Sequence, residues 1–153
     1  MRVLVVDDNA DIRMLLSQVL NVGGIEVVEA DSGPAALELL RSGGELPDLV
    51  LLDIQMPFVD GWQTLTQIRA DSGTAELPVV LCTVKSSPDN VARGFELGCD
   101  GYLTKPFDAG EIIAEVRAVA ARSLEERRRV RGDELSKAQQ SLRMIVAPRP
   151  VAA

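Results

Sequence analysis

Acidic side chains directly follow two apolar segments that lie far apart in this chain. Residues 3–6 are followed at once by Asp7 and Asp8, and residues 49–52 are followed by Asp53. Carboxylates that share one crevice repel each other strongly unless a cation lies among them. Oxygen ligands without an imidazole or a thiolate are typical of a hard divalent ion such as Mg²⁺. The three acids therefore predict a magnesium site, provided that the fold brings them together.

A hydroxyl and a lysine stand in equivalent places after two further apolar segments. Thr83 ends the segment that starts at residue 78, and Lys105, followed by Pro106, comes directly after residues 101–104. A lysine beside Mg²⁺ neutralises the oxygens of a phosphoryl group during in-line transfer. Each of these residues alone is common in turns, helix caps or strands. Their joint occurrence after four apolar segments favours chemistry on a phosphoryl group.

Two hydrophobic periods alternate through the first 120 residues and predict the elements that position these side chains. Short apolar segments typical of buried strands occupy residues 3–6, 25–30, 49–52, 78–81 and 101–104. Between them, apolar residues recur three or four apart, as in helices with one buried face. Five strands alternating with five helices predict an α/β fold with a doubly wound parallel sheet covered on both faces. Ligands of such sheets bind at the carboxyl ends of the strands, where all the candidate residues stand.

The composition narrows the class of protein. The chain has 153 residues, 46% of them hydrophobic and 25% charged, which suits one domain with an ordinary core. No apolar run approaches the roughly 20 residues of a membrane span, and the early acids do not fit a signal peptide. Cys82 and Cys99 are too few for a disulfide scaffold and fit a reduced, cytoplasmic setting. The absence of histidine excludes Ser-His-Asp hydrolases, the usual zinc sites and a phosphohistidine supplied by the chain itself.

The net charge of −7 is distributed unevenly. Residues 1–120 carry 8 Lys/Arg and 19 Asp/Glu, whereas residues 121–153 carry 8 Lys/Arg and 4 Asp/Glu. An acidic body argues against direct nucleic-acid binding, because phosphate backbones require a basic face. The basic segment is interpreted as a charged, solvated helix.

The stretch from Arg2 to about Arg122 resembles a bacterial response-regulator receiver domain, the phosphoacceptor part of two-component signalling. The resemblance lies in the motifs and their spacing, namely Val5-Val6-Asp7-Asp8-Asn9, Leu51-Leu52-Asp53-Ile54-Gln55-Met56-Pro57 with Asp60-Gly61, Thr83, and Tyr102-Leu103-Thr104-Lys105-Pro106-Phe107. It implies a flavodoxin-like sheet with the strand order 2-1-3-4-5 and a receiver domain over residues 1–122.

The resemblance also implies roles for the acids. Asp53 would accept a phosphoryl group from a phosphohistidine on a separate histidine kinase or phosphotransfer protein. Asp8 would ligate Mg²⁺ directly and Asp7 through a water molecule. The backbone carbonyl of Gln55 and a carboxylate oxygen of Asp53 would complete the protein's share of the ligands.

Further roles follow from the same resemblance. Lys105 would pair with the phosphoryl oxygens, and its peptide bond to Pro106 would be cis. Thr83 and Tyr102 would form a switch pair, in which the hydroxyl moves to the phosphoryl group and the ring turns inward. A downstream protein partner would then dock on the face formed by the fourth helix, the fifth strand and the fifth helix.

Three positions are expected to tune the reaction rates. Val84 stands where the family usually has alanine or glycine, and its extra methyl groups would crowd the phosphoryl pocket. Gln55 and Lys85 occupy positions that in this family tune the attack of water on the aspartyl phosphate. None of these departures removes a reactive group.

Residues 123–153 are interpreted as a helical extension with a frayed end, too short for a DNA-binding output domain. Ser123 is a candidate helix start, Gly132 is expected to interrupt the helix, and residues 147–150 are expected to be loose. A thin apolar stripe is formed by Leu135, Leu142 and Ile145. A sharper hypothesis makes the extension a docking or dimerising segment that reports the state of Asp53.

The leading hypothesis is a stand-alone cytoplasmic receiver, a possible homodimer, which signals by protein contacts and has no dedicated substrate turnover. One alternative is a magnesium-dependent phosphatase with an aspartyl nucleophile. It is disfavoured because such enzymes need a second acid where Gln55 stands. The other alternative is a receiver-like module that acts without phosphorylation, and the intact reactive residues argue against it.

Overall fold

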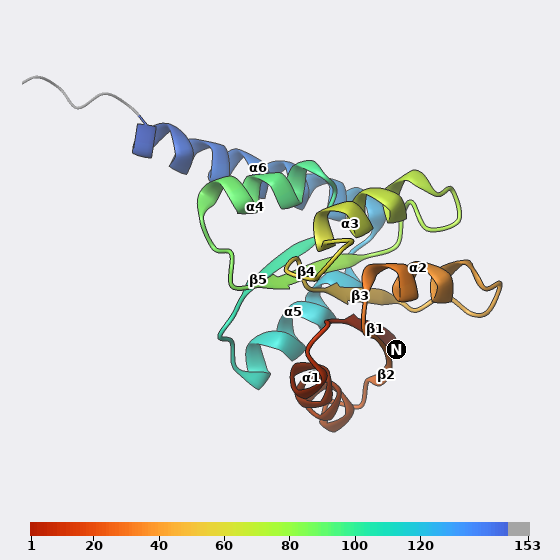
Figure 1. The fold of residues 1–153 in the computed structure, drawn as a ribbon. Coiled ribbons are helices and arrows are strands. Elements are labelled where there is room, and N and C mark those ends of the chain that lie inside the picture. The colour runs from red at the N-terminus through yellow and green to blue at the C-terminus, as the bar shows by residue number, and fades with distance from the viewer. Residues whose placement is uncertain (147–153) are drawn as a thin grey trace, which may run out of the picture.

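The computed structural model describes residues 1–146, and within them five strands form one parallel sheet in the order β2-β1-β3-β4-β5 (Figure 1). The strands are β1 (Arg2–Val6), β2 (Glu26–Ala30), β3 (Leu49–Leu52), β4 (Val79–Thr83) and β5 (Gly101–Thr104). Every residue of β3 and β4 is buried, as expected for central strands covered on both faces. The predicted fold class and strand order are confirmed.

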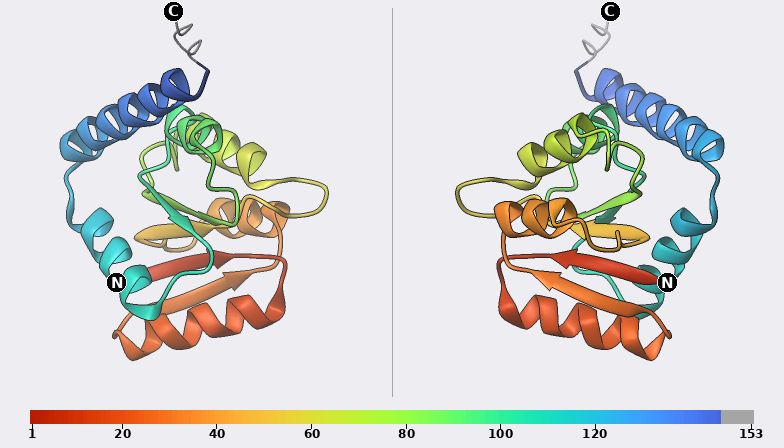
Figure 2. Two further views of the ribbon diagram at one scale, coloured as in Figure 1. Left: turned by 90° about the vertical axis from the view of Figure 1, so that its left-hand side faces the viewer. Right: turned by 90° about the vertical axis from the view of Figure 1, so that its right-hand side faces the viewer.

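Helices cover both faces of the sheet (Figure 2). The helices in the described chain are α1 (Ala10–Val22), α2 (Gly33–Arg41), α3 (Gly61–Ala70), α4 (Pro88–Glu96), α5 (Ala109–Ala121) and α6 (Leu124–Val146). The two cores follow the alternation of side chains along β1: Val3 and Val5 pack with α1 and α5, whereas Leu4 and Val6 pack with α2, α3 and α4.

Polar residues at the carboxyl ends of the strands start the helices. Asn9 accepts hydrogen bonds from the N–H groups of residues 11 and 12, and Ser32 accepts one from residue 35. Asp60 forms a reciprocal capping box with Gln63, whereas Asp108 shows only the bond accepted from the N–H of residue 111. The loops that carry the candidate site are therefore held at both ends by regular structure.

Helix α6 differs from the expectation in two respects. It runs unbroken through Gly132, whose cost in a helix interior is about 1 kcal/mol and is offset by packing of α6 along α4. It is also not uniformly solvated, because Arg127 is 5% exposed. The predicted loose segment 147–150 lies outside the described residues. Within residues 1–146, no helix has the length and apolar composition needed to cross a membrane.

Candidate functional site

Three carboxylates that are distant in the sequence meet at one edge of the sheet. Asp7, Asp8 and Asp53 each offer an oxygen atom, and these atoms all lie within 4.8 Å of one another. The cause is the pairing of β1 with β3, since the N–H of Asp53 donates to the carbonyl of Val6 at 3.0 Å. Asp7 and Asp53 are buried and Asp8 is exposed, so the cluster opens to solvent at one side.

Lys105 joins the acids from the end of β5. Its Nζ lies 2.9 Å from Asp7 Oδ2 and 3.6 Å from Asp53 Oδ2. Its backbone N–H donates to the carbonyl of Thr83 at 2.8 Å, and its peptide bond to Pro106 is cis. The ammonium group therefore lies between two of the three carboxylates and reduces their mutual repulsion.

The protonation of Asp53 is shifted by its surroundings. Burial raises its pKa to about 6, and the charges of Asp7 and Asp8 act in the same direction. Lys105 and the N–H of Gln55 lower the pKa of Asp53, but they do not compensate fully. For Lys105, burial alone would lower the pKa, yet the hydrogen bond to Asp7 and the charges of Asp53 and Asp7 together raise it.

The donor set fits Mg²⁺. Carboxylate oxygens are the ligands that this ion prefers, and it usually retains several waters, for which the exposed side at Asp8 leaves access. Asp7 is oriented through Oδ1, which accepts the N–H of Asn9 at 2.9 Å. The peptide of Gln55 also lies at the site, because its N–H donates to Asp53 Oδ1 at 3.2 Å.

The backbone of Lys85 connects the two residues of the expected switch pair. The Thr83 side chain is fully buried, and its Oγ1 accepts the Lys85 N–H at 3.3 Å. The Tyr102 hydroxyl donates to the Lys85 carbonyl. Val84, expected to crowd the site, is 55% exposed on the same loop.

Two further residues shape the site: sequence analysis missed Arg13, and it quoted Gly61 only as part of a motif. Arg13 donates from Nη1 to the backbone carbonyl of Asp7 at 2.7 Å, and its place in the first turns of α1 was the available signal. Gly61 lets α3 begin against the loop that follows β3, since a Cβ at this position would collide with the carbonyl of Asp53. The motif Asp60-Gly61 contained this information, but the collision depends on the packing of α3.

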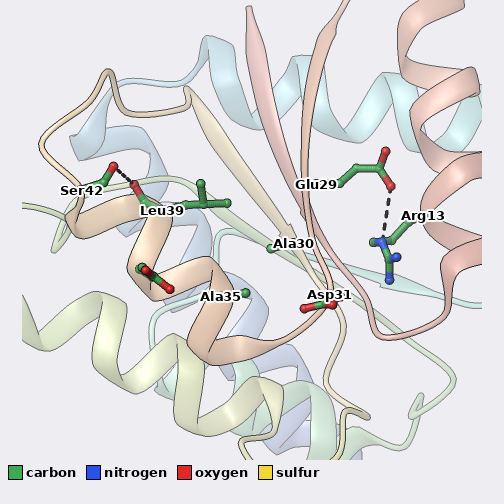
Figure 3. A pocket seen from close by; sticks show the side chains of 8 residues that line it. Arg13, Glu29, Ala30, Asp31, Ala35, Leu39 and Ser42 are labelled. Atoms are coloured by element: carbon green, nitrogen blue, oxygen red, sulfur yellow. Dashed lines mark hydrogen bonds and ion pairs between the residues drawn. The ribbon is translucent and has the colours of Figure 1, made fainter.

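A cavity of about 640 Å³ beside β2 is a separate feature (Figure 3). It is lined by Arg13, Glu29, Ala30, Asp31, Ala35, Glu38, Leu39 and Ser42. Arg13 Nε lies 3.4 Å from Glu29 Oε1 within it. The cavity contains none of the three clustered acids, so the candidate site is the acidic cluster rather than this hollow.

The uncompensated charge of Asp53 leads to a first prediction. With metal removed by chelation, we expect Asp53→Asn to raise the free energy of unfolding at pH 7 by about 1 kcal/mol, a value reduced for screening by water. The folded protein binds a proton at Asp53 more tightly than the unfolded chain does, because folding raises the pKa of Asp53 from 3.8 to about 6. The cost of the charge is therefore present above pH 6 and disappears below about pH 4.

Urea unfolding at pH 7 and pH 4 measures this difference. The matched control is Asp133→Asn, at an exposed position of α6, which should leave stability unchanged at both pH values. Equal or lower stability of Asp53→Asn at pH 7 would contradict the prediction.

The comparisons with known proteins agree on one family. The family model described as response regulator receiver domain matches residues 3–117. The chain is 41% identical over 122 residues to probable transcriptional regulator ycf27 of Guillardia theta, covering 80% of this chain and 46% of that protein. It is 38% identical over 121 residues to the phosphate regulon transcriptional regulatory protein PhoB of Escherichia coli, covering 79% of this chain and 52% of that protein.

Solved structures give the same result. A putative response regulator from Chloroflexus aurantiacus matches with a TM-score of 0.74 and 33% identity, covering 79% of this chain and 98% of that one. The chemotaxis protein CheY4 of Vibrio cholerae matches with a TM-score of 0.72 and 30% identity, covering 77% and 97%. The chain spans about half the length of the curated relatives it matches. With the family model matching most of its length, this chain belongs to the response regulator receiver-domain family.

Proposed function

We propose that this protein accepts a phosphoryl group on Asp53 from a phosphohistidine of a histidine kinase or phosphotransfer protein, and signals through protein–protein contacts. The observation that carries the proposal is the convergence of Asp7, Asp8 and Asp53 with the ammonium group of Lys105. The 153 residues contain no histidine, so none of them can be the phosphohistidine donor.

The proposed reaction is an in-line displacement on phosphorus. A carboxylate oxygen of Asp53 forms the new oxygen–phosphorus bond while the nitrogen–phosphorus bond breaks. The bonding electron pair returns to the donor's imidazole, which takes up a proton. Bound Mg²⁺, held by Asp7, Asp8, Asp53 and the Gln55 carbonyl, would neutralise charge on the phosphoryl oxygens.

The residues around Asp53 have separate proposed roles. Lys105 pairs with a phosphoryl oxygen, and the hydroxyl of Thr83 moves to meet another. This movement would break the contact between Thr83 and the Lys85 N–H. The Lys85 peptide could then shift, and its shift would move Tyr102, whose hydroxyl binds the Lys85 carbonyl. Gln55, Val84 and Lys85 tune the loss of the phosphoryl group to water.

The proposal assigns residues 1–122 to the receiver domain and residues 123–153 to an extension. A downstream protein partner would dock at the face of α4, β5 and α5, where it also meets α6, because α6 packs on α4 (Figure 1). The acidic body disfavours direct nucleic-acid contact. The free, buried Cys82 and Cys99 suit a reducing cytoplasm.

The proposal also includes that the protein acts alone and forms a homodimer. The mass of the endogenous protein would test the first of them. The native mass of the chain with and without a phosphoryl group would test the second.

Intact-mass measurement tests the phosphoacceptor function. Incubation with Mg²⁺ and a small acyl phosphate should add one phosphoryl group to the chain, and chelation of Mg²⁺ should prevent the gain. Asp53→Asn should show no gain, whereas Asp133→Asn should gain as the wild type does. An unmodified wild-type protein, or a gain retained in Asp53→Asn, would overturn the proposal.

A further inference from the structure

Helix α6 packs along α4 at the β5 edge of the sheet (Figures 1 and 2), where Val130 and Glu134 line a hollow together with Tyr102 of β5. Its apolar contribution is small: Ala138 is buried, and Leu135 packs against the core cluster that contains Phe95. Met144 and Ile145 near its end are 77% and 67% exposed. So thin an apolar contact does not explain how α6 is held in one register.

A buried charge cluster supplies the missing anchor. The Asp100 carboxylate is fully buried just before β5, and it accepts hydrogen bonds from two arginines of α6. Arg131 binds it through Nε at 2.9 Å and Nη2 at 2.7 Å, and Arg127 through Nη1 at 3.1 Å. Arg127 also donates to the carbonyl of Glu76 at 2.5 Å. Buried charge-assisted contacts of this kind fix geometry, because each charge is costly without its partner.

Besides α6, helix α4 contacts α3, where Arg93 lies 4.6 Å from the centroid of the Trp62 ring, and the core beneath it. Its buried residues are Ala92, Gly94 and Phe95, and its N-cap Ser87 makes no side-chain capping bond. At Gly94 it approaches the sheet closely, since a Cβ there would lie 3.2 Å from Cδ2 of Tyr102. The loop that leads into α4 carries the Lys85 peptide that binds both Tyr102 and Thr83. The position of α4 therefore determines where the Tyr102 ring and this loop lie.

We propose that Arg127 and Arg131 are positioning residues for phosphoryl binding at Asp53, which they promote by anchoring α6 on Asp100 and thereby holding α4 in place. This inference rests on the proposed function and adds a regulatory element to it. A phosphoryl group that recruits Thr83 requires an ordered loop and a seated Tyr102. Ordering the loop and the ring on binding costs conformational entropy. When α6 already orders α4, less entropy is lost on binding, so the affinity for the phosphoryl group is higher.

The test uses the full chain and beryllofluoride with Mg²⁺ as the probe, an analogue of a phosphoryl group on a carboxylate. The variant Arg127→Gln/Arg131→Gln leaves Asp100 with Arg69 and the N–H of Val79, so the carboxylate keeps partners. We expect its beryllofluoride affinity to fall about tenfold. Hydrogen exchange of the α4 and α6 amides should accelerate in the same variant.

The matched control is Arg128→Gln/Arg129→Gln, which removes the same charge from exposed positions of α6. It should bind beryllofluoride as the wild type does. If the double variant is too unstable, the single variants Arg127→Lys and Arg131→Lys keep the charge and should show smaller losses in the same direction. Unchanged or tighter binding despite faster exchange in α6 would overturn this inference alone. Failure of the wild type to bind the probe would overturn the proposed function and this inference with it.

Discussion

Replacing Lys105 with methionine should slow the proposed phosphoryl transfer to Asp53 about 100-fold, because one preorganised charge that would face the phosphoryl oxygens is lost. The ammonium group stands 3.6 Å from Asp53 Oδ2 and is held there by its 2.9 Å contact with Asp7. Methionine has a similar length and flexibility but provides no positive charge. The rate of mass gain with a small acyl phosphate at saturating Mg²⁺ measures the effect.

The rate loss in the Lys105→Met variant should depend on pH. Lys105 lowers the pKa of Asp53, so its removal shifts that pKa above the present value of about 6. A larger fraction of Asp53 is then protonated near pH 6.5 than near pH 8, and only the carboxylate is a nucleophile. At Mg²⁺ concentrations well below saturation, where a bound ion does not hold Asp53 ionised, the ratio of wild-type to variant rates should therefore be larger at the lower pH.

The chain offers a control for the Lys105 variant. It contains three lysines, and the side chain of Lys137 on α6 is 73% exposed. Lys137→Met should retain the wild-type rate at both pH values. A Lys105→Met rate within twofold of wild type would contradict the role assigned to this residue.

The sheet and the meeting of the acids were predictable because both depend on local patterns and on topology. Continuous apolar segments mark strands buried on both faces, and parallel pairing places the residue after each strand at one edge. Asp7 and Asp53 needed no further information to come together, since β1 and β3 are neighbours. The distance between Lys105 and these acids, by contrast, depends on the side-chain conformation and required the structure.

The anchoring of α6 was not predictable from the pattern of its own sequence. A run of arginines normally lies in solvent, and no local signal distinguishes Arg127 from its exposed neighbours 128 and 129. Its burial depends on Asp100, which lies 27 residues earlier in the chain. Pairing over such a separation is decided by packing in three dimensions. The continuity of the helix through Gly132 has the same origin, because contacts along α4 outweigh a local preference.

Replacing Asp100 with alanine should lower the free energy of unfolding by about 3–5 kcal/mol, the usual cost of breaking a buried ion pair. The side chain of Asp100 is fully buried and receives three guanidinium groups, including that of Arg69 at 3.1 Å. Without the carboxylate these like charges face one another in a poorly solvated space. The pKa of Arg69 already shows the cost, since burial lowers it to about 10 even with Asp100 present.

Urea unfolding at pH 7 measures the loss, with Asp133→Ala at an exposed position as the control that should change stability little. Asp100→Asn keeps the shape and an acceptor oxygen, so its free energy of unfolding should fall between those of Asp100→Ala and the wild type.

A double-mutant cycle with Arg127→Ala should give a coupling energy of about 1 kcal/mol or more, because the two side chains are in direct contact. A loss below about 1 kcal/mol for Asp100→Ala would mean that the arginines find enough backbone carbonyls without the acid, as Arg69 does at Leu77 and Gly98. The charge cluster would then be dispensable for holding α6 against the receiver fold.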